Sequence, residues 1–461
     1  MPKTIDLKQY FPTYGIKNIK VRCRAEGYKD SEFATTVVNN LPMLSYKKRV
    51  LYYTNVLLGV STINLYIDGV LADSIEHDPT STEDVTIDLE SYTMDETINI
   101  HEFYINVTGD NLDFTSLVAY SAGVYGVSGL YQSDYNLTRT DDAEDMSFVI
   151  DNSTGQISSD FNDAFPWKDI KVETIDGNEM VTFPEMWFRV NCDDSMRLTD
   201  IAVSEVKMAT GNWYKVESFS VGRYKTTVAN KVAQSVSGKS LNNGYSMNDY
   251  RTYSQAIGTG WNMVDAYHRT VMQFLWLIEF ATKKSDTIMT GRIHSSGTSG
   301  GSGLRPTGGT NDITTPSGFE TKYAQMRWHY VEDFIGNTYD YLEGWYNGYV
   351  TADPANFGSS TTGKIKLGYT INTSQNSYCI KALGWDSNNP FLCFPIEVVS
   401  NSSYNTYFCD GWYYTNSSYP VFYCGASSGS SSAYTGLFYS YYNFATNANN
   451  NSGSRLLKIP E

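Results

Sequence analysis

The chain has 461 residues, a formal net charge of -16 and only 18% charged residues. This acidity argues against nucleic-acid binding, which needs a basic face to displace counterions from phosphate, and against attachment to an anionic membrane surface. The 37 Tyr, 21 Phe and 9 Trp, set among so few charges, indicate all-β structure, an aromatic binding surface, or both.

The N-terminal sequence does not resemble a signal peptide, and the cysteine spacing does not resemble a zinc ribbon. The six cysteines form no Cys-x-x-Cys pair, which disfavours a zinc ribbon or a thioredoxin-like site. The residues after Met1 lack an apolar signal core and a lipid-attachment cysteine, and no run approaches the ~18 apolar residues of a membrane span. We therefore expect synthesis in the cytoplasm, no membrane insertion, and release by lysis or within a particle.

Residues 1–45 are expected to form an N-terminal β segment for attachment or oligomerisation. The run IKNIKVRCRA (16–25) alternates with a period near two, and GYKDSEFATTVV (27–38) supplies a turn and a second extended run. This pair resembles the closing strands of bacterial immunoglobulin-like modules, in which a Gly-Tyr-x-Asp-Ser turn precedes the last strand.

Residues 46–122 are expected to form a small antiparallel β-sandwich. The candidate strands are VLYYTNVLL (50–58), STINLYIDG (61–69), DVTIDL (84–89) and INIHEFYINVTG (98–109). Turn-rich acidic segments separate them, and strands at this spacing are typical of a sandwich.

The sequence pattern changes after residue 123. Residues 262–282 are predicted to form a helix, because apolar side chains recur at i, i+3, i+4 and i+7. The stripe consists of Val271, Phe274, Leu275 and Ile278. A Gly/Ser/Thr-rich tract at 295–318 is expected to be a flexible surface loop, since the same fold continues beyond it.

Four sequence blocks follow one another in 123–461. They are the series YGV (125–127), LTRTDD (137–142), FPWKDI (165–170), GNEMVTFPEMWFR (177–189) and VGRYK (221–225), then MQFLWLIEFAT (272–282), MRWHYVEDFIGNTYDYLEGW (326–345) and GLFYSYYNFATNANNNSGSRLL (436–457). In this order they resemble the variable proteins of diversity-generating retroelements, such as phage tropism determinants. The resemblance implies a C-type lectin fold, related to that of formylglycine-generating enzymes.

The block at 326–345 is similar to a family signature through Glu332, Gly336 and Asn337. The departures from that signature are His329, Tyr330, Asp333 and Tyr341, and they weaken the case for an ion contact carried over from the family. A structural turn is favoured for the three matching residues, because Gly and Asn tolerate positive φ and Glu332 can hold the turn by hydrogen bonds. The alternative is a calcium site of carboxylate and amide oxygens; no other cofactor is expected.

Residues 400–454 have an unusual composition. Asp410 is the only charged residue among them, Lys, Glu, Gln and Met are absent, and Tyr, Ser and Asn make up more than half. Such a stretch is too aromatic for an ordinary disordered tail and too rich in Ser and Asn for an ordinary core. Asn codons end in a pyrimidine, and the residues present, apart from Trp412, are those reachable from such a codon when its adenines are replaced. We therefore place a variable region at about 400–445, the product expected of adenine-directed diversification.

This composition matches the chemistry of antibody loops, in which rigid amphipathic Tyr side chains combine with adaptable Ser, Gly and Asn. The predicted ligand contacts are Tyr404, Asn405, Tyr407, Asp410, Trp412, Tyr413, Tyr414, Tyr423, Ser427, Ser428, Tyr434, Tyr441, Asn443 and Phe444. Trp412 cannot arise from a pyrimidine-ended codon, so a fixed anchor or a scaffold residue is expected there. The alternative for the whole stretch is an aromatic-decorated sheet without a recognition role.

A second set of residues is predicted to be structural, because it matches the family's fixed frame. The set is Glu332, Gly336, Asn337, Gly436, Leu437, Phe438, Gly453, Arg455, Leu456 and Leu457. The last two are expected to belong to a closing strand that returns to the core.

Catalysis is not expected. No nucleophile elbow, P-loop or His-Glu-x-x-His motif occurs, and no two of the five histidines stand at metal-ligand spacing. Cys409 and Cys424 invite comparison with the cysteine pair of formylglycine-generating enzymes, but both lie in the candidate variable region, where Cys is one accessible outcome. An enzyme acting on polysaccharide would need two carboxylates, and residues 400–454 contain one acid.

The expected fold class is α+β and β-rich, with immunoglobulin-like β units at 1–45 and 46–122 and a C-type lectin domain at 123–461. The resemblance implies a receptor-binding protein at the tip of a phage tail fibre, within the virion. Its expected partners are a bacterial host-surface protein or glycan and other tail proteins, and the family implies a homo-oligomer such as a trimer. The alternatives are a bacterial surface adhesin, which neighbouring secretion or pilin genes would indicate, and an enzyme acting on surface polysaccharide.

Overall fold

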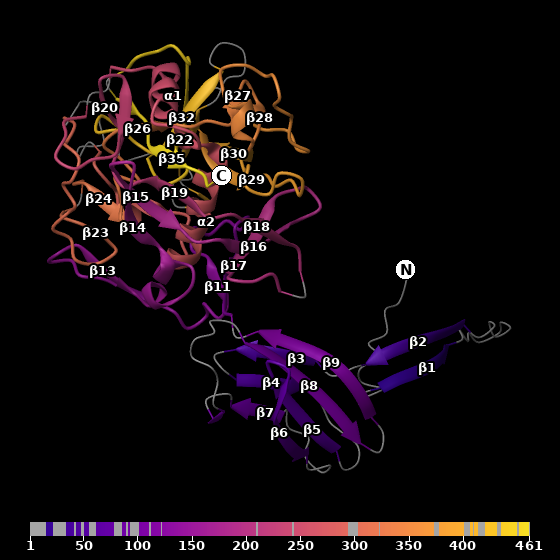
Figure 1. The fold of residues 1–461 in the computed structure, drawn as a ribbon. Helices are drawn as coiled ribbons and strands as arrows, with labels where there is room; N and C mark the ends of the chain where they lie inside the picture. Colours follow the sequence, from indigo (N-terminus) through magenta and orange to yellow (C-terminus); the bar gives the residue numbers. More distant parts are fainter. Residues whose placement is uncertain are drawn as a thin grey trace. The chain divides into compact units, whose positions relative to one another are not determined.

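The computed structural model describes the second part of the chain more fully than the first. From residue 124 to 460 it describes all but 209–210, 242–243, 294–302, 322, 373–377, 401–405, 409, 414–419, 431–434 and 450; before that it describes 15–21, 34–40, 43–47, 50–54, 61–77, 85–88, 91–92, 101–109, 112–120 and 122–123. The chain divides into two compact units, Met1–Gly123 and Val124–Glu461 (Figure 1). Both units are rich in antiparallel strands, and the described residues contain two α-helices.

The first unit consists of antiparallel strands. Its sheets are β1 (Gly15–Val21) with β2 (Ala34–Asn40); β3 (Met43–Lys47), β4 (Val50–Thr54) and β7 (Val85–Asp88); and, in the order β6-β5-β8-β9, β6 (Val70–His77), β5 (Ser61–Ile67), β8 (Glu102–Gly109) and β9 (Leu112–Tyr120). Ile63, Leu65 and Ile67 alternate along β5 and are buried, as one core-facing side of a strand requires. The strand β9 was not predicted, and the division of this unit at residue 45 stays a prediction.

Four sheets form most of the second unit. They have the orders β11-β10-β17-β16-β18, β12-β13-β23-β24-β25, β14-β15-β19-β35-β22 and β30-β29-β31-β33-β32-β26-β34. The bounds are β10 (Val124–Ser128), β11 (Thr138–Asp141), β12 (Phe148–Ile150), β13 (Gln156–Ser159), β14 (Lys171–Ile175), β15 (Asn178–Phe183), β16 (Met186–Cys192), β17 (Leu198–Ser204), β18 (Trp213–Val216), β19 (Phe219–Gly222), β22 (Trp261–Met263), β23 (Ser317–Phe319), β24 (Met326–Trp328), β25 (Val331–Glu332), β26 (Tyr339–Tyr341), β29 (Tyr378–Leu383), β30 (Pro395–Ser400), β31 (Gly411–Tyr413), β32 (Val421–Cys424), β33 (Ser440–Asn443), β34 (Ser452–Gly453) and β35 (Leu456–Lys458). Two short hairpins complete the set, β20 (Thr227–Ala229) with β21 (Val232–Gln234) and β27 (Trp345–Tyr346) with β28 (Tyr349–Val350).

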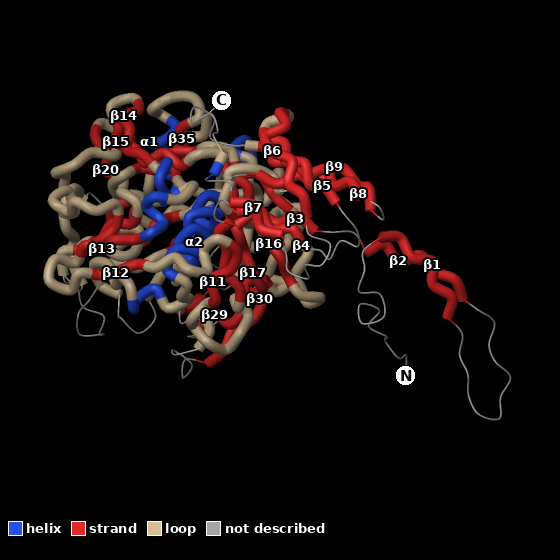
Figure 2. The backbone as a smooth tube through the Cα atoms, turned by 90° about the horizontal axis from the view of Figure 1, so that it is seen from below, coloured by secondary structure: helices blue, strands red, loops and turns tan. Residues whose placement is uncertain are grey.

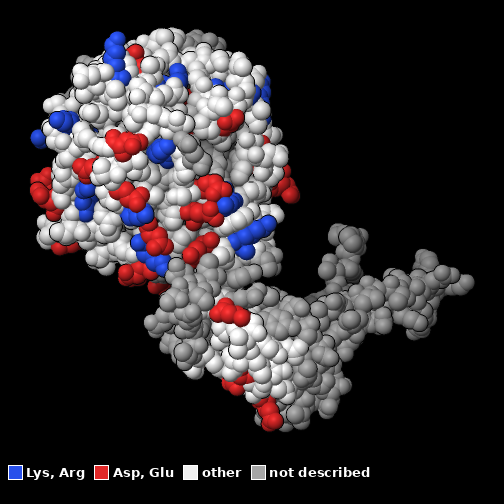
Figure 3. Space-filling view, viewed as in Figure 1, with Lys and Arg blue, Asp and Glu red and all other residues white. Residues whose placement is uncertain are grey.

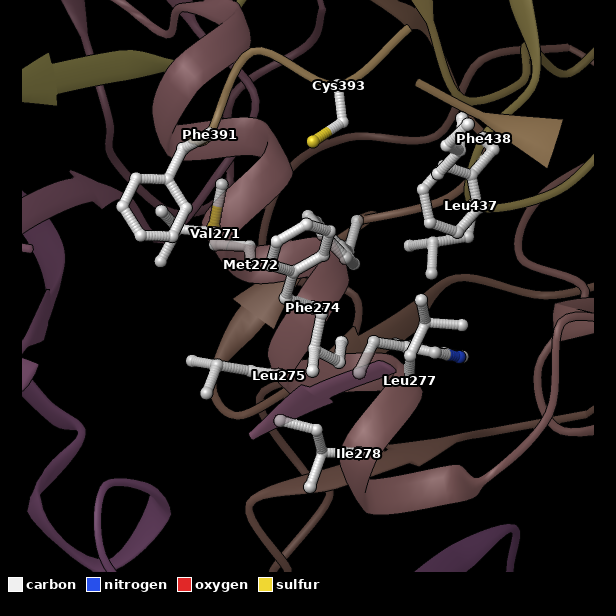
Figure 4. Packing of buried hydrophobic residues seen from close by; sticks show 14 of the residues in the cluster. Val271, Met272, Phe274, Leu275, Leu277, Ile278, Phe391, Cys393, Leu437 and Phe438 are labelled. Atoms are coloured by element: carbon white, nitrogen blue, oxygen red, sulfur yellow. The ribbon is translucent and has the colours of Figure 1, made fainter. Parts of the chain in front are cut away.

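The predicted helix is α2 (Ala266–Phe280), shorter at both ends than expected. Asp265 caps it by accepting a hydrogen bond from the His268 N–H at 2.7 Å, and Ala281 ends it in the left-handed conformation. The single apolar stripe was wrong, because every residue of α2 except Tyr267 is buried. A helix enclosed on all sides is a core helix, and Figures 2 and 4 show it among strands, with Phe391, Cys393 and Phe438 from later segments around it.

The other helix, α1 (Met247–Gln255), was not predicted from its polar sequence. Ser246 and Asp249 form a reciprocal capping box at its start. Its buried residues include Met247 and Tyr250, which pack with tyrosines of the seven-stranded sheet. No helix among the described residues is long and apolar enough to cross a membrane.

The chain end returns to the core, as predicted for Leu456 and Leu457. Both are fully buried in β35, which pairs antiparallel with β19 and with β22. The tract at 295–318 differs from the predicted flexible loop in its described part. Thr307 and Thr310 are buried there, because the carboxylate of the buried Glu332 accepts hydrogen bonds from this segment.

Candidate ligand-binding surface

The seven-stranded sheet contains much of the predicted variable region. β31, β32 and β33 all lie between residues 411 and 443, and β26 and β34 complete that side of the sheet. β33 runs parallel to β31 and antiparallel to β32. Residues directly opposite on neighbouring strands share a face, so the register defines what each face carries.

One face carries a row of tyrosines across four adjacent strands, here named the tyrosine ladder. Its members are Tyr413 in β31, Tyr441 in β33, Tyr423 in β32, and Tyr339 and Tyr341 in β26. Tyr413 lies opposite Tyr441, Tyr441 opposite Tyr423, and Tyr423 opposite Tyr341. Ring centroids are 5.4 Å apart for Tyr413 and Tyr441, 5.8 Å for Tyr441 and Tyr423, and 4.3 Å for Tyr423 and Tyr339. Such cross-strand pairs stabilise a sheet by about 0.2–1 kcal/mol each.

Burial decreases along the ladder. Tyr341 is covered by Tyr250 of α1, with ring centroids 6.5 Å apart. Tyr341 and Tyr423 are buried, whereas Tyr413 and Tyr441 are half-buried. The end of the ladder at Tyr413 and Tyr441 is therefore a part that solvent and a ligand can reach, as is the half-buried Tyr339 of β26.

Two of the ladder hydroxyls have hydrogen-bond partners within the described chain. The Tyr339 hydroxyl lies 2.7 Å from Ser430 Oγ. The Tyr341 hydroxyl donates to the Asn447 carbonyl at 2.9 Å and accepts from Asn443 Nδ2 at 2.8 Å. Burial raises the pKa of Tyr341 to about 12, so this phenol acts as a neutral hydrogen-bonding group at physiological pH.

The structure places the predicted contacts in three groups. Asp410, Trp412, Tyr423, Ser427, Ser428 and Asn443 are buried; Tyr407, Tyr413 and Tyr441 are half-buried; and Phe444 is 44% exposed. Tyr404, Asn405, Tyr414 and Tyr434 lie outside the described residues. The buried six support the surface from within, so their prediction as direct contacts is corrected.

Internal hydrogen bonds explain why polar members of this group are buried. The Asp410 carboxylate accepts from the Phe438 N–H at 2.7 Å, and Trp412 Nε1 donates to the Asn372 carbonyl at 2.8 Å on the other face of the sheet. The Ser428 N–H donates to the Asn337 carbonyl at 3.0 Å. Ser and Asn are mostly exposed in proteins, but a polar group with a partner in the chain can be buried without a large penalty.

The turn at 332–337 lies beneath this surface. The Glu332 carboxylate accepts from the Gly308 N–H at 2.8 Å and from the N–H and hydroxyl of Thr310 at 2.9 and 2.8 Å. Gly336 has φ +91, and a Cβ there would lie 2.5 Å from the backbone nitrogen of Arg292. These contacts favour the structural turn over the calcium alternative, because the carboxylate oxygens already hold chain donors.

Asn337 links the same turn to its neighbours on both sides. Its Oδ1 accepts from the Arg305 N–H at 3.0 Å, and its Nδ2 donates to the Arg305 carbonyl at 3.0 Å and to Asp333 Oδ2 at 2.7 Å. Gln325 Nε2 donates to the same Asp333 oxygen at 2.9 Å. Burial and the adjacent Glu332 carboxylate raise the pKa of Asp333 to about 7.

Arg455 joins three distant segments. Its Nη1 donates to the carbonyls of Gly222 and Arg223 at 2.7 and 3.1 Å, and its Nη2 donates to those of Glu332 and Asp333 at 2.6 and 3.2 Å. The side chain is almost fully buried, so it acts as a cross-link between the chain end and the turn.

Two predicted frame glycines are sites of close approach. A Cβ on Gly436 would lie 2.0 Å from Asp410 Oδ1, and one on Gly453 would lie 2.6 Å from Thr338 Oγ1. Phe438, which follows Gly436, is buried against the core. Only glycine allows the chain to pass so near these side chains.

A buried ion pair that the sequence analysis did not predict also stabilises the sheet. Lys225 Nζ lies 2.8 Å from Asp340 Oδ2, and both side chains are only 2% exposed. Asp340 alternates with Tyr339 and Tyr341 along β26, so it points to the opposite face from the ladder. We name five of the buried charged residues together, Lys225, Glu332, Asp333, Asp340 and Arg455, the buried charge frame.

Two observations on the described residues concern metal ligands and the predicted cysteine pair. They contain no group of three His, Cys, Asp or Glu side chains that could hold a metal ion. Burial raises the pKa of the Cys424 thiol, which disfavours the reactive thiolate, and Cys409 lies outside the described residues. His329 is buried with its Nε2 3.0 Å from Glu279 Oε2, a pair inside the core.

Sequence reasoning missed Tyr339 as a member of the surface and Lys225 and Asp340 beneath it. The Tyr-x-Tyr alternation at 339–341 is a strand signal that could have linked β26 to the tyrosine-rich segment. Nothing local in the sequence pairs Lys225 with Asp340.

Comparisons with known proteins do not define a family. No family model and no curated protein matches the chain. Among solved structures, the chain aligns with the structure of PvdO from Pseudomonas aeruginosa at 11% sequence identity and a TM-score of 0.26, over 63% of this chain and 98% of that chain. A likeness at this TM-score is too weak to assign a fold, so the lectin-like and immunoglobulin-like assignments stay predictions.

Proposed function

We propose that the chain is a non-enzymatic receptor-binding protein of a phage tail-fibre tip. In this proposal, immunoglobulin-like N-terminal units attach or oligomerise it, and a C-type-lectin-like second unit displays a variable surface to a bacterial host. The observation that carries the proposal is the tyrosine ladder, because Tyr413, Tyr423 and Tyr441 all come from the compositionally unusual segment and meet on one sheet face. Rigid aromatic anchors combined with Ser and Asn are typical of recognition surfaces.

Sequencing the gene deeply from a propagating population tests the diversification. Substitutions should concentrate between about 400 and 445, at accessible positions such as Tyr407, Tyr413 and Tyr441. Buried supports such as Asp410 and Gly436 should stay fixed, because changes there disturb the sheet. Variation that is absent, or spread evenly along the gene, would remove this part of the proposal.

Adsorption of the purified full-length protein to a panel of bacterial cells tests recognition itself. We expect at least one strain to retain the protein, and Tyr441→Ala to weaken that retention about ten-fold or more. Tyr214→Ala is the matched control. Tyr214 is a half-buried tyrosine of β18, a strand of a different sheet, and it packs on Trp385. Equal losses in the two variants would mean that the ladder is structural.

A further inference from the structure

The segment that builds the tyrosine ladder contributes no charge to its surface. Asp410 is the only Asp, Glu, Lys, Arg or His in residues 400–454, including the residues outside the described ranges. Its carboxyl group is buried, accepts a hydrogen bond from the Phe438 N–H and lies against Gly436. Burial raises its pKa well above the ordinary value, so even this group favours the neutral form.

Charged groups on the elements next to the ladder are held in ion pairs, and Lys381 of the neighbouring β29 is paired with Glu397 at 2.6 Å. Asp340 points to the opposite face of β26 and is paired with Lys225. On the side of α1, Arg251 is paired with the buried Glu343. In Figure 3 the acidic side chains of the second unit gather over its lower part, and the upper part carries scattered Lys and Arg side chains with few acidic ones.

The ring geometry determines which atoms a ligand meets. Tyr423 is stacked on Tyr441 with 17° between the ring planes and on Tyr339 with 27°. Rings packed face against face cover one another's faces. Tyr413 is instead tilted by 41° from Tyr441, so this end of the ladder presents hydroxyl groups, C–H edges and part of a ring face. The serine and asparagine side chains of the segment add further uncharged donors and acceptors.

Three classes of ligand meet such a surface differently. A charged polymer would lose hydration without gaining an opposite charge. A smooth apolar protein patch would leave the hydroxyl and amide groups unpaired, at about 1–3 kcal/mol for each buried group. A neutral sugar chain offers hydroxyl groups, which pair with the hydroxyl and amide groups of this surface, and C–H groups, which pack on exposed ring faces.

We propose that the tyrosine ladder binds an uncharged, hydroxyl-rich polysaccharide. This inference rests on the proposed receptor-binding function and names its ligand class. It applies to the accessible end of the ladder, at Tyr413 and Tyr441.

The test is binding of the full-length protein to immobilised bacterial polysaccharides, sorted into neutral ones and ones with uronic acid, sialic acid or phosphate. We expect retention on at least one neutral polysaccharide, with less than about a two-fold change in Kd between ~0.05 M and ~0.5 M NaCl. Tyr441→Phe, which keeps the ring and removes the hydroxyl, should weaken binding about three- to ten-fold. Tyr413→Ala should weaken it about ten-fold or more, and Tyr214→Ala should not.

Retention only on acidic polysaccharides, or a Kd that rises steeply with salt, would overturn the inference. Failure to bind any polysaccharide, while ladder-dependent adsorption to cells persists, would overturn it too and would leave the receptor-binding proposal standing. If the wild-type protein adsorbed to none of the cell strains, that result would instead count against the receptor-binding proposal itself. The two failures are therefore distinguishable.

Discussion

The buried charge frame and the tyrosine ladder meet at β26, where Asp340 points to one face and Tyr339 and Tyr341 point to the other. In the frame, charged side chains are buried, and in the ladder, aromatic side chains reach the surface. Charged residues are almost never fully buried unless paired, and Lys225 and Asp340, each only 2% exposed, form such a pair. Large aromatic residues usually fill cores, yet Tyr413 and Tyr441 remain half-exposed. The difference teaches that stability and recognition use separate residues here. A frame held by buried hydrogen bonds can tolerate changes on the ladder, whereas changes in the frame should unfold the unit.

The largest effect is expected from Arg455→Met. It removes hydrogen bonds to four backbone carbonyls and the buried positive charge that lowers the pKa of Glu332 against the effect of burial. We expect the free energy of unfolding to fall by roughly 3–5 kcal/mol. Urea denaturation followed by tryptophan fluorescence measures it, because all 9 Trp lie after residue 123 and report on the second unit alone.

Arg305→Met is the matched control, since its side chain is exposed and forms no ion pair with any described residue. It should change the free energy of unfolding by no more than about 0.5 kcal/mol. Similar losses for the two variants would contradict the assignment of Arg455 as the cross-link of the frame.

A smaller effect is expected from Gly336→Ala. Gly336 and Gly177 both have positive φ, at +91 and +78, but a Cβ on Gly336 meets the Arg292 backbone nitrogen at 2.5 Å and one on Gly177 meets nothing within 4 Å. Gly177→Ala should therefore cost only the backbone strain, about 1 kcal/mol, and Gly336→Ala roughly 3 kcal/mol through the added clash. Equal losses in the two variants would show that the turn at 336 can move aside.

The structural features that could be predicted from the sequence are those that depend on residues close together in the chain. The apolar spacing predicted α2, and composition alone marked residues 400–454 as unusual. The closing strand at Leu456 and Leu457 followed from its apolar pattern and its resemblance to a family ending. The depletion of charge on the ladder is likewise readable from residue types, because it needs no knowledge of placement.

The remaining features depend on contacts between residues far apart in the chain. Ser427, Ser428 and Asn443 looked like surface residues, and only the register of the sheet shows that their partners are internal. The frame joins positions near 225, 332–340 and 455, and no periodicity links such distant segments. The helix α1 has too little apolar periodicity to be predicted, although its Ser246–Asp249 capping box was a readable start signal.

The smallest expected effect concerns pH and Asp333. Its pKa is raised to about 7 in the folded protein, whereas an aspartate in an unfolded chain titrates near ~3.9. Between these values the folded state holds a proton that the unfolded state has lost, so this group makes stability fall as pH rises through the window. From pH ~5 to ~7.5 the loss should be roughly 2 kcal/mol for the wild-type protein.

Asp333→Asn separates this contribution from every other titration. An Asn carbonyl in place of Oδ2 keeps the hydrogen bonds from Gln325 and Asn337, and its amide occupies the place of Oδ1, which has no partner among the described residues. The variant should therefore lose the downward slope, while Asp312→Asn, an exposed change, should retain it. If the stability of the wild-type protein instead rose with pH over this range, in parallel with that of Asp333→Asn, Asp333 would be ionised in the folded protein. Ligand binding should stay level over the same pH range, because the ladder consists of tyrosines, a residue type that in model peptides titrates only near ~10. A binding profile that followed the stability profile would mean that the frame and the ladder are coupled.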